Sequence, residues 1–213
     1  MQLFIFDLDG TLIDSKLDIV AAVNAARDQM GLPGLATETI ASYVGNGAPV
    51  LMQKAMGADA PAELVAEALR RFLDYYHANP LVHTKLYPGV REALDELHAC
   101  GKALAVLTNK PEVITHQIVE GLNLKNHFFR SYGGDSMAER KPHPMGIEKL
   151  MAESGIGATD TLMVGDSYVD IRTARNAGVG ACGVTYGFQP ESLITDAPDF
   201  LIDDMRELLA HAG

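Results

Sequence analysis

Short apolar runs, each bounded by polar residues or glycine, recur along the chain and are too short for helices. Four of them have the character of parallel strands that are buried on both faces of a sheet. They comprise residues 3–6, 103–107, 161–164 and 181–185. A further short run, residues 200–202, predicts a last strand near the end of the chain.

Amphipathic stretches lie between these runs and predict helices. Residues 91–100, for example, place Ala93, Leu94 and Leu97 on one face. Further helices are expected at residues 111–120, 147–153, 168–177 and 205–210. Glycines that suit the end of a helix follow four of these stretches: Gly101, Gly121, Gly155 and Gly178. Strands that alternate with helices predict an α/β fold with a doubly wound, Rossmann-like and mostly parallel sheet.

Residues 15–84 interrupt this alternation because they contain helix-like segments only. Glycine and proline, which break helices, separate the segments, at residues 17–30, 39–44, 50–56 and 62–77. The simplest interpretation is a helical domain inserted after the first strand. We therefore expect a core domain of residues 1–14 and 85–213 and a helical cap domain of residues 15–84.

The formal charge of −11, from 17 Lys and Arg against 28 Asp and Glu, argues against a general nucleic-acid binder, since such a surface repels phosphates. No run approaches the roughly 20 apolar residues that cross a bilayer. The strand-like start also differs from a secretory signal, so we expect a cytoplasmic protein without membrane contact. Cys100 and Cys182 lack metal-ligand spacing and do not indicate a disulfide scaffold.

Two carboxylates follow the first predicted strand, in the segment Phe6-Asp7-Leu8-Asp9-Gly10-Thr11. Ligands of open α/β sheets bind just beyond the carboxyl ends of the strands. Residues two apart in an extended segment project to the same side, so Asp7 and Asp9 face one small volume. Two close carboxylates need a cation or a shared proton. The alternative is that both are plain loop residues.

A second acidic pair, Asp166 and Asp170, follows the third strand. A helix that begins here places the two carboxylates, four residues apart, on one face. Converging carboxylates without a Cys/His cluster describe an oxygen-ligand site that suits Mg²⁺ better than Zn²⁺. The alternative role of Asp166 is to cap the following helix, which is compatible with metal binding.

Two further segments carry candidate polar groups. Thr108 and Asn109 follow the second strand and precede a helix, where a hydroxyl and backbone N–H groups bind anions; both residue types are also common N-caps. Lys141 precedes a proline, which favours an extended backbone, and its alternative is a plain surface lysine. His143, between two prolines, is interpreted as part of the spacing and not as a catalytic group.

The order of these segments resembles the haloacid dehalogenase superfamily, and the helical insertion lies where its helical-cap members carry theirs. The matching residues are Phe6 to Thr11, Thr108, Lys141, Gly165, Asp166 and Asp170. Within the superfamily the chain is most similar to the phosphoglycolate phosphatases, on residues 6–15, 107–111, 141–144, 165–170 and 186–187. The resemblance implies a Mg²⁺-dependent phosphatase for small phosphate monoesters, with 2-phosphoglycolate as the expected substrate.

The resemblance also implies a role for each residue. Asp7 is the expected nucleophile, which forms an aspartyl-phosphate, and Asp9 is the expected general acid and base. The groups expected to bind the phosphoryl oxygens or offset their charge are Thr108, the N–H of Asn109, and Lys141. The expected Mg²⁺ ligands are Asp7, the backbone carbonyl of Asp9, Asp166 and, through a water, Asp170.

Substrate recognition is expected in the cap, at the loop of residues 43–47, because its glycines let the backbone approach a ligand. The predicted substrate-binding residues are Gly45, Asn46, Gly47 and Lys54. Lys16 and Arg70 are further candidates for the cation that meets the carboxylate of phosphoglycolate. A plain helix–helix connection is the alternative role of the loop.

Other activities stay open at this point. One alternative is a capped phosphatase for pyrophosphate, a sugar phosphate or a nucleoside monophosphate, and another is a phosphomutase with the same aspartyl-phosphate. A non-catalytic binding protein is disfavoured because every expected catalytic position is filled. The expected partner is a small phosphorylated metabolite, and the chain is expected to be a monomer or a homodimer.

Overall fold

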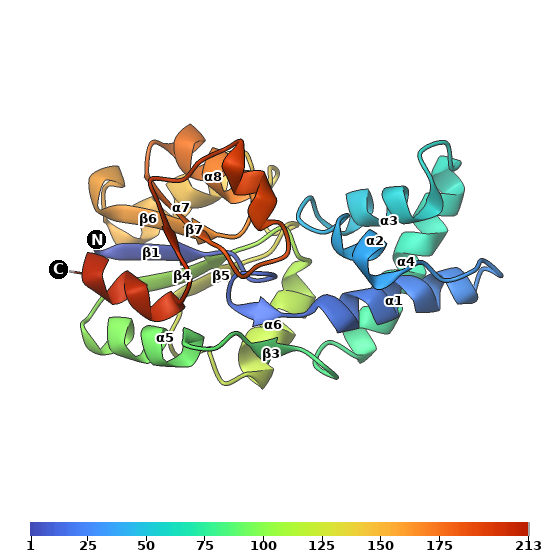
Figure 1. Cartoon of the computed structure of the whole chain (residues 1–213), viewed down its shortest axis with the longest axis horizontal. Coiled ribbons are helices and arrows are strands. Elements are labelled where there is room, and N and C mark those ends of the chain that lie inside the picture. Colours follow the sequence, from blue (N-terminus) through green and yellow to red (C-terminus); the bar gives the residue numbers. More distant parts are fainter. Residues whose placement is uncertain (213) are drawn as a thin grey trace.

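Six parallel strands form the central sheet of the computed structural model, which describes residues 1–212 (Figure 1). They are β1 (Leu3–Phe6), β4 (Ala103–Leu107), β5 (Arg130–Tyr132), β6 (Thr161–Gly165), β7 (Gly180–Val184) and β8 (Phe200–Ile202). Their order across the sheet is β5-β4-β1-β6-β7-β8. The chain therefore runs outward from β1 on one side and outward from β6 on the other. The switch between β1 and β6 is the place where such sheets bind ligands.

Helices cover both faces of this sheet. They are α5 (Val90–Ala99), α6 (Glu112–Gly121), α7 (Met145–Ser154) and α8 (Tyr168–Ala177), with the 3-10 helices η1 (Ala158–Asp160), η2 (Pro190–Ile194) and η3 (Met205–His211). Phe4 and Phe6 of β1 belong to one hydrophobic core with α5, α6 and η3, while Leu3 and Ile5 belong to another with α7 and α8. This alternation buries both faces, and it confirms the predicted α/β fold.

Four further helices form the lobe on the right of Figure 1: α1 (Lys16–Asp28), α2 (Thr37–Ala41), α3 (Ala48–Met56) and α4 (Ala62–Ala78). α4 packs on both α1 and α3 and buries Phe72 and Tyr76. The antiparallel ribbon of β2 (Ile13–Asp14) and β3 (Lys85–Leu86) joins the lobe to the sheet domain. The ribbon lies at both predicted domain boundaries, and the division into residues 1–14 with 85–213 and residues 15–84 stays a prediction. None of the described helices is long and apolar enough to span a membrane.

Some elements differ from the sequence-based prediction. The edge strand β5 is absent from it, because the three residues of β5 are polar or aromatic and form no apolar run. Gly121 is predicted to follow α6 but is its last residue, and the left-handed backbone beyond this helix belongs to Asn123. A side chain at Gly121 would collide with Leu81, so this glycine provides space for a close contact. The predicted helix at residues 205–210 is a 3-10 helix.

Asp18, in the first turn of α1, links by hydrogen bonds the two chain segments that connect the helical lobe to the sheet. Its buried carboxylate accepts hydrogen bonds from the N–H groups of His83 and Thr84, at 3.0 and 2.8 Å. Thr84 Oγ1 donates a further bond of 2.7 Å. Because a buried carboxylate is costly without such donors, Asp18 fixes the place where the chain returns to the sheet domain.

Replacing Asp18 with asparagine removes the charge and one acceptor from this cluster. We expect Asp18→Asn to lower the free energy of unfolding by about 1–3 kcal/mol, the range for a buried group left without its partner, as measured by urea denaturation. Asp28→Asn is the control, since Asp28 is an exposed residue of the same helix, and it should change stability by less than about 0.5 kcal/mol. Equal stability of Asp18→Asn and the wild type would contradict the linking role.

Candidate active site

Three neighbouring strands end at the same edge of the sheet, and each is followed by a predicted site residue. Asp7, Thr108 and Asp166 directly follow β1, β4 and β6. β1 lies between the other two strands and pairs with both in parallel register, up to Phe6 opposite Val106 and Val164. The fold therefore gathers residues that are far apart in the sequence.

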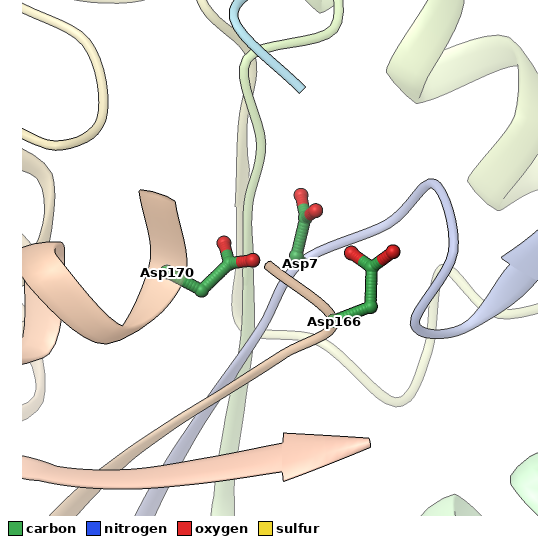
Figure 2. Close-up of side chains that lie close together, drawn as sticks. All are labelled: Asp7, Asp166 and Asp170. Atoms are coloured by element: carbon green, nitrogen blue, oxygen red, sulfur yellow. The ribbon is translucent and has the colours of Figure 1, made fainter. Parts of the chain in front are cut away.

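Three buried carboxylates face one another at this edge. Figure 2 shows Asp7 on the segment after β1, Asp166 after β6 and Asp170 on α8, with their carboxylates turned toward a common volume. Each offers one oxygen, and these oxygens lie within 4.8 Å of one another. The structure thus brings together the three side chains that the sequence predicts as metal ligands.

Lys141 lies among these acids with its side chain almost fully buried. Its Nζ is 2.8 Å from Asp7 Oδ1 and 2.6 Å from Asp170 Oδ1. Burial alone would lower the pKa of Lys141, but the carboxylates of Asp170 and Asp7 outweigh this effect and raise the pKa. Lys141 is therefore held as an ammonium between two acids, and the alternative of a plain surface lysine is wrong.

Backbone and hydroxyl donors orient the other two acids. Asp166 Oδ2 accepts hydrogen bonds from the N–H groups of Phe188, at 2.6 Å, and Gln189, at 3.3 Å. Asp170 Oδ2 accepts from the N–H and the hydroxyl of Ser167, which is the N-cap residue of α8. The alternative role of Asp166 as the helix cap is therefore wrong, because Ser167 and Asp170 form the capping box.

Gly10 is required where the chain turns after Asp9. Its φ of 83° lies in the left-handed region, which favours glycine. A Cβ at this position would collide with the carboxylate of Asp166. The turn that follows β1 can therefore approach the acid of β6 only because residue 10 has no side chain.

The pKa values of these acids show how unfavourable their grouping is. Burial raises the pKa of Asp7 to about 6, although Lys141 acts in the opposite direction, and Asp170 adds to the rise. Burial, together with Asp170 and Asp7, raises the pKa of Asp166 well above its usual range. One ammonium does not offset three buried carboxylates. A further positive charge is needed to keep all three ionised near neutral pH.

These observations fit a hard cation such as Mg²⁺. The grouped ligands are carboxylate oxygens, which hard cations such as Mg²⁺ prefer. Cys100 and Cys182 are free thiols, one exposed and one buried, and neither belongs to the cluster of acids. The cluster of Asp7, Asp166 and Asp170 can therefore hold the predicted cofactor.

Asp9 lies beside this cluster and forms an ion pair with Lys110, which is not among the predicted site residues. Lys110 Nζ is 2.8 Å from Asp9 Oδ1 and 3.1 Å from Asp9 Oδ2. Lys110 also donates a hydrogen bond to the hydroxyl of Tyr76 in α4, and Ser15 donates one to Asp9. In the sequence, the one indication that Lys110 belongs to the site is its position, directly after Thr108 and Asn109 and before the proline that precedes α6.

Thr108 and Asn109 are both buried and line the cavity beside Asp7. Thr108 Oγ1 accepts a hydrogen bond of 3.2 Å from the N–H of Lys110. The side-chain amide of Asn109 donates to the carbonyl oxygens of Gly45, at 2.9 Å, and Lys141, at 3.0 Å. Asn109 thus connects the cap loop to the segment that carries Lys141.

The cavity in front of Asp7 lies between the sheet domain and the helical lobe. It leaves about 50 Å³ for the centres of water-sized molecules. Its residues on the lobe are mainly apolar and include Ile19, Val44, Ala48, Leu51 and Phe72. The polar residues that line it include Asp7, Asp9, Thr108, Asn109, Lys110 and Asp166.

The predicted substrate-binding residues of the cap are only partly at this cavity. Gly45 and Gly47 line it. Asn46 instead donates a hydrogen bond of 3.1 Å to the hydroxyl of Tyr168, and the exposed Lys54 has its Nζ 5.6 Å from the ring centroid of Tyr43.

The other candidate cations and His143 also lie outside the lining of the cavity. Lys16 Nζ lies 5.4 Å from the ring centroid of Phe188, which lines the cavity. Arg70 pairs with Glu67 on the surface of α4. His143 accepts a hydrogen bond from the N–H of Met145. Lys16 is therefore the candidate that contacts a cavity-lining side chain.

Comparison with known proteins agrees with this fold and with the order of the acids. The model of the haloacid dehalogenase-like hydrolases matches residues 4–184, a range that includes the acids of β1 and β6 and the whole helical lobe. The chain therefore belongs to this family, as its sequence motifs predict.

Individual relatives resemble the chain over nearly its whole length. A phosphoglycolate phosphatase of Vibrio parahaemolyticus is 38% identical over 98% of this chain and 95% of its own. One of Pseudomonas fluorescens is 39% identical over 98% of this chain and 78% of its own. A solved structure described as a "predicted phosphoglycolate phosphatase" of Haemophilus somnus superposes with a TM-score of 0.95 at 33% identity, over 100% of this chain and 98% of its own.

Protons should compete with Mg²⁺ at this site, because Asp7, with its pKa of about 6, becomes protonated as the pH falls through that value. We expect Mg²⁺ to raise the Tm at about pH 7.5 and to raise it much less at about pH 5. Thermal unfolding with Mg²⁺ and with EDTA measures the two shifts.

Asp166→Asn should remove most of the Mg²⁺-dependent rise in Tm at the higher pH, because it deletes a carboxylate of the cluster. Asp59→Asn, at an exposed residue of the cap, should keep the full shift. A shift that grows toward acid pH, or one that survives in Asp166→Asn, would contradict a metal site at these acids.

Proposed function

We propose that the chain is a Mg²⁺-dependent phosphatase that hydrolyses 2-phosphoglycolate to glycolate and phosphate through an aspartyl-phosphate on Asp7. The observation that carries this proposal is the buried position of Asp7 beside Lys141 and the other acids, in the lining of a cavity between the sheet domain and the cap. The names of the relatives support the choice of substrate.

Asp7 is the nucleophile in this proposal. A carboxylate attacks phosphorus only when it is ionised, and burial raises the pKa of Asp7 to about 6, so most of it is ionised at neutral pH. Lys141, 2.8 Å from Asp7 Oδ1, favours that state and stabilises charge that develops during transfer. When bound, Mg²⁺ supplies the positive charge that offsets repulsion between Asp7 and the phosphate dianion. We propose as its ligands Asp7, the backbone carbonyl of Asp9, Asp166 and, through a water, Asp170.

Asp9 transfers protons in both half-reactions. It protonates the leaving alkoxide of glycolate and then deprotonates the water that attacks the aspartyl-phosphate, steps that general acids and bases accelerate. Its carboxylate lines the same cavity as Asp7. Because breaking a carbon–halogen bond requires no acid at this position, Asp9 favours phosphate transfer over dehalogenation.

Thr108, the N–H of Asn109 and Lys141 bind the phosphoryl oxygens in this proposal. Thr108 and Asn109 lie between the end of β4 and the start of α6, where N–H groups and the helix dipole favour anions. Lys141 reaches Asp7 from a different segment, the one that precedes α7. The phosphoryl group is therefore held on several sides, which suits the large barrier of phosphate-monoester hydrolysis.

The size of the cavity favours a short leaving group. Apolar residues of the lobe and polar residues of the sheet domain line the small space in front of Asp7. Glycolate is much smaller than a hexose or a nucleoside, so it is the leaving group that this space accommodates most readily. Gly45, Asn46, Gly47 and Lys54 stay predicted contacts of the substrate, and Lys16 is the candidate cation nearest to the cavity lining.

We also propose a setting for this activity. The partner is a small phosphorylated metabolite, the compartment is the cytoplasm, and the chain acts as a monomer or a homodimer. A substrate of this kind carries its own negative charge, so the cations of the site must attract it against a chain with a formal charge of −11.

Phosphate release from a panel of esters tests the proposed function. The panel contains phosphoglycolate, pyrophosphate, sugar phosphates and nucleoside monophosphates, each measured with Mg²⁺ and with EDTA. We expect phosphoglycolate to have the highest kcat/KM, and EDTA to abolish turnover. Asp7→Asn should lose more than about 10³-fold, as removal of a nucleophile does. A preference for another ester would contradict the substrate, and an active Asp7→Asn would contradict the mechanism.

The role of Asp9 predicts a dependence on the leaving group. Asp9→Asn should lower kcat for phosphoglycolate by about 10²–10⁴-fold, the usual effect of a general acid or base. With p-nitrophenyl phosphate, whose leaving group needs no proton, the variant should release one equivalent of nitrophenol rapidly and then turn over slowly. Stopped-flow absorbance measures this burst. The same loss for both esters, without a burst, would contradict the assignment.

A further inference from the structure

Lys110 occupies an unusual position for a residue that the mechanism does not use. It follows Thr108 and Asn109 and precedes α6, and its side chain is only 2% exposed. A buried lysine is costly unless its charge is compensated. Its ammonium is compensated by Asp9, which is the residue proposed to transfer protons.

The contacts of Lys110 fix the orientation of the Asp9 carboxylate. Lys110 Nζ is 2.8 Å from Oδ1 and 3.1 Å from Oδ2, so it spans both oxygens. Ser15 donates a second hydrogen bond to Oδ1. A carboxylate held by two donors in this way cannot rotate freely about its last bond, and proton transfer depends on such placement.

The third partner of Lys110 comes from the cap. Tyr76 lies in α4, its ring is buried, and its hydroxyl accepts a hydrogen bond from Lys110 Nζ. Burial raises the pKa of Tyr76 well above its usual value, and the charge of Asp9 adds to this rise, so the hydroxyl stays neutral. Asp9, Lys110 and Tyr76 all line the cavity in front of Asp7.

We propose that Lys110 is a positioning residue for the proton transfers of Asp9, and that Tyr76 makes this positioning depend on closure of the cap. The inference rests on the role of Asp9 in the proposed function. When the helical lobe covers the cavity, α4 brings Tyr76 to Lys110, and the ammonium holds Asp9 in one orientation. When the lobe moves away, this contact is lost and Asp9 is less well placed.

A purely structural role of the ion pair between Lys110 and Asp9 predicts different results. If Lys110 only neutralised a half-buried carboxylate, its loss would lower stability and affect all substrates alike. A positioning residue acts through Asp9, so its loss should matter most in steps that transfer a proton. It should also matter little once Asp9 itself has been replaced, because mutations that act through one group are not additive.

The test uses four variants of the full chain: Lys110→Met, Asp9→Asn, the double variant, and Tyr76→Phe. Lys110→Met should lower kcat for phosphoglycolate by about 10²-fold, the scale of a misplaced reacting group, and change KM by less than about threefold. It should also show a burst of nitrophenol from p-nitrophenyl phosphate. In the Asp9→Asn background the same substitution should cost less than about threefold.

Tyr76→Phe removes only the cap contact and should lower kcat by roughly tenfold, as the loss of one hydrogen bond to a charged group predicts. It also carries the test if Lys110→Met does not fold, as checked by thermal unfolding. Lys125→Met is the control, because Lys125 is 72% exposed and pairs with Glu120 at the surface; it should keep wild-type kinetics.

The outcomes separate this inference from the proposed function. An active wild type in which Lys110→Met costs as much in the Asp9→Asn background as alone, or costs nothing, would overturn the positioning role while the phosphatase stands. Wild-type kinetics for Tyr76→Phe would overturn the dependence on the cap. A wild type that releases no phosphate from any ester would overturn the proposed function itself.

Discussion

Repulsion among buried carboxylates is the constraint on which the rest of the active site depends. Asp7, Asp166 and Asp170 converge within 4.8 Å because the strands β1 and β6 end side by side. Like charges at this distance in a buried site strongly oppose ionisation. Lys141 and the N–H groups of residues 188 and 189 offset part of the repulsion. The repulsion that remains favours the binding of a cation among these carboxylates.

The same edge of the sheet also holds the cap in place. The amide of Asn109 donates to Gly45, and the amide of Gln189 donates to Val44 at 2.6 Å. Lys110 adds a contact with Tyr76 of α4. Asn109, Gln189 and Lys110 each belong to a loop that also contacts or carries a residue of the candidate active site. The cap is therefore joined to the site through hydrogen bonds and not only through apolar packing.

The sequence was sufficient for five of the six strands and for the position of the acids, because both depend on local patterns. Buried runs such as residues 3–6 and 161–164 define the strands, and residues that directly follow a strand must lie at its carboxyl end. The strand β5 and the glycine at position 121 were not predictable in this way, since an edge strand needs no apolar run and Gly121 reports a contact with Leu81.

Contacts between the cap and the sheet domain were not predictable from the sequence, for a related reason. The pairing of Lys110 with Asp9 and Tyr76 joins positions far apart in the chain, and no periodicity encodes it. The predicted cap loop did reach the cavity through Gly45 and Gly47. Lys54 does not line it: its side chain is exposed, and its Nζ lies near the ring of Tyr43.

The formal charges of the site explain why a divalent cation suits it better than a monovalent one. Four carboxylates, of Asp7, Asp9, Asp166 and Asp170, surround the ammonium groups of Lys110 and Lys141. The difference is two negative charges, which one Mg²⁺ cancels and one Na⁺ or K⁺ does not. A site left negative would repel a phosphate dianion, and the formal charge of −11 on the whole chain adds to that repulsion. Attraction of an anionic substrate is therefore local, and a bound divalent cation would favour it by cancelling the excess negative charge of the site.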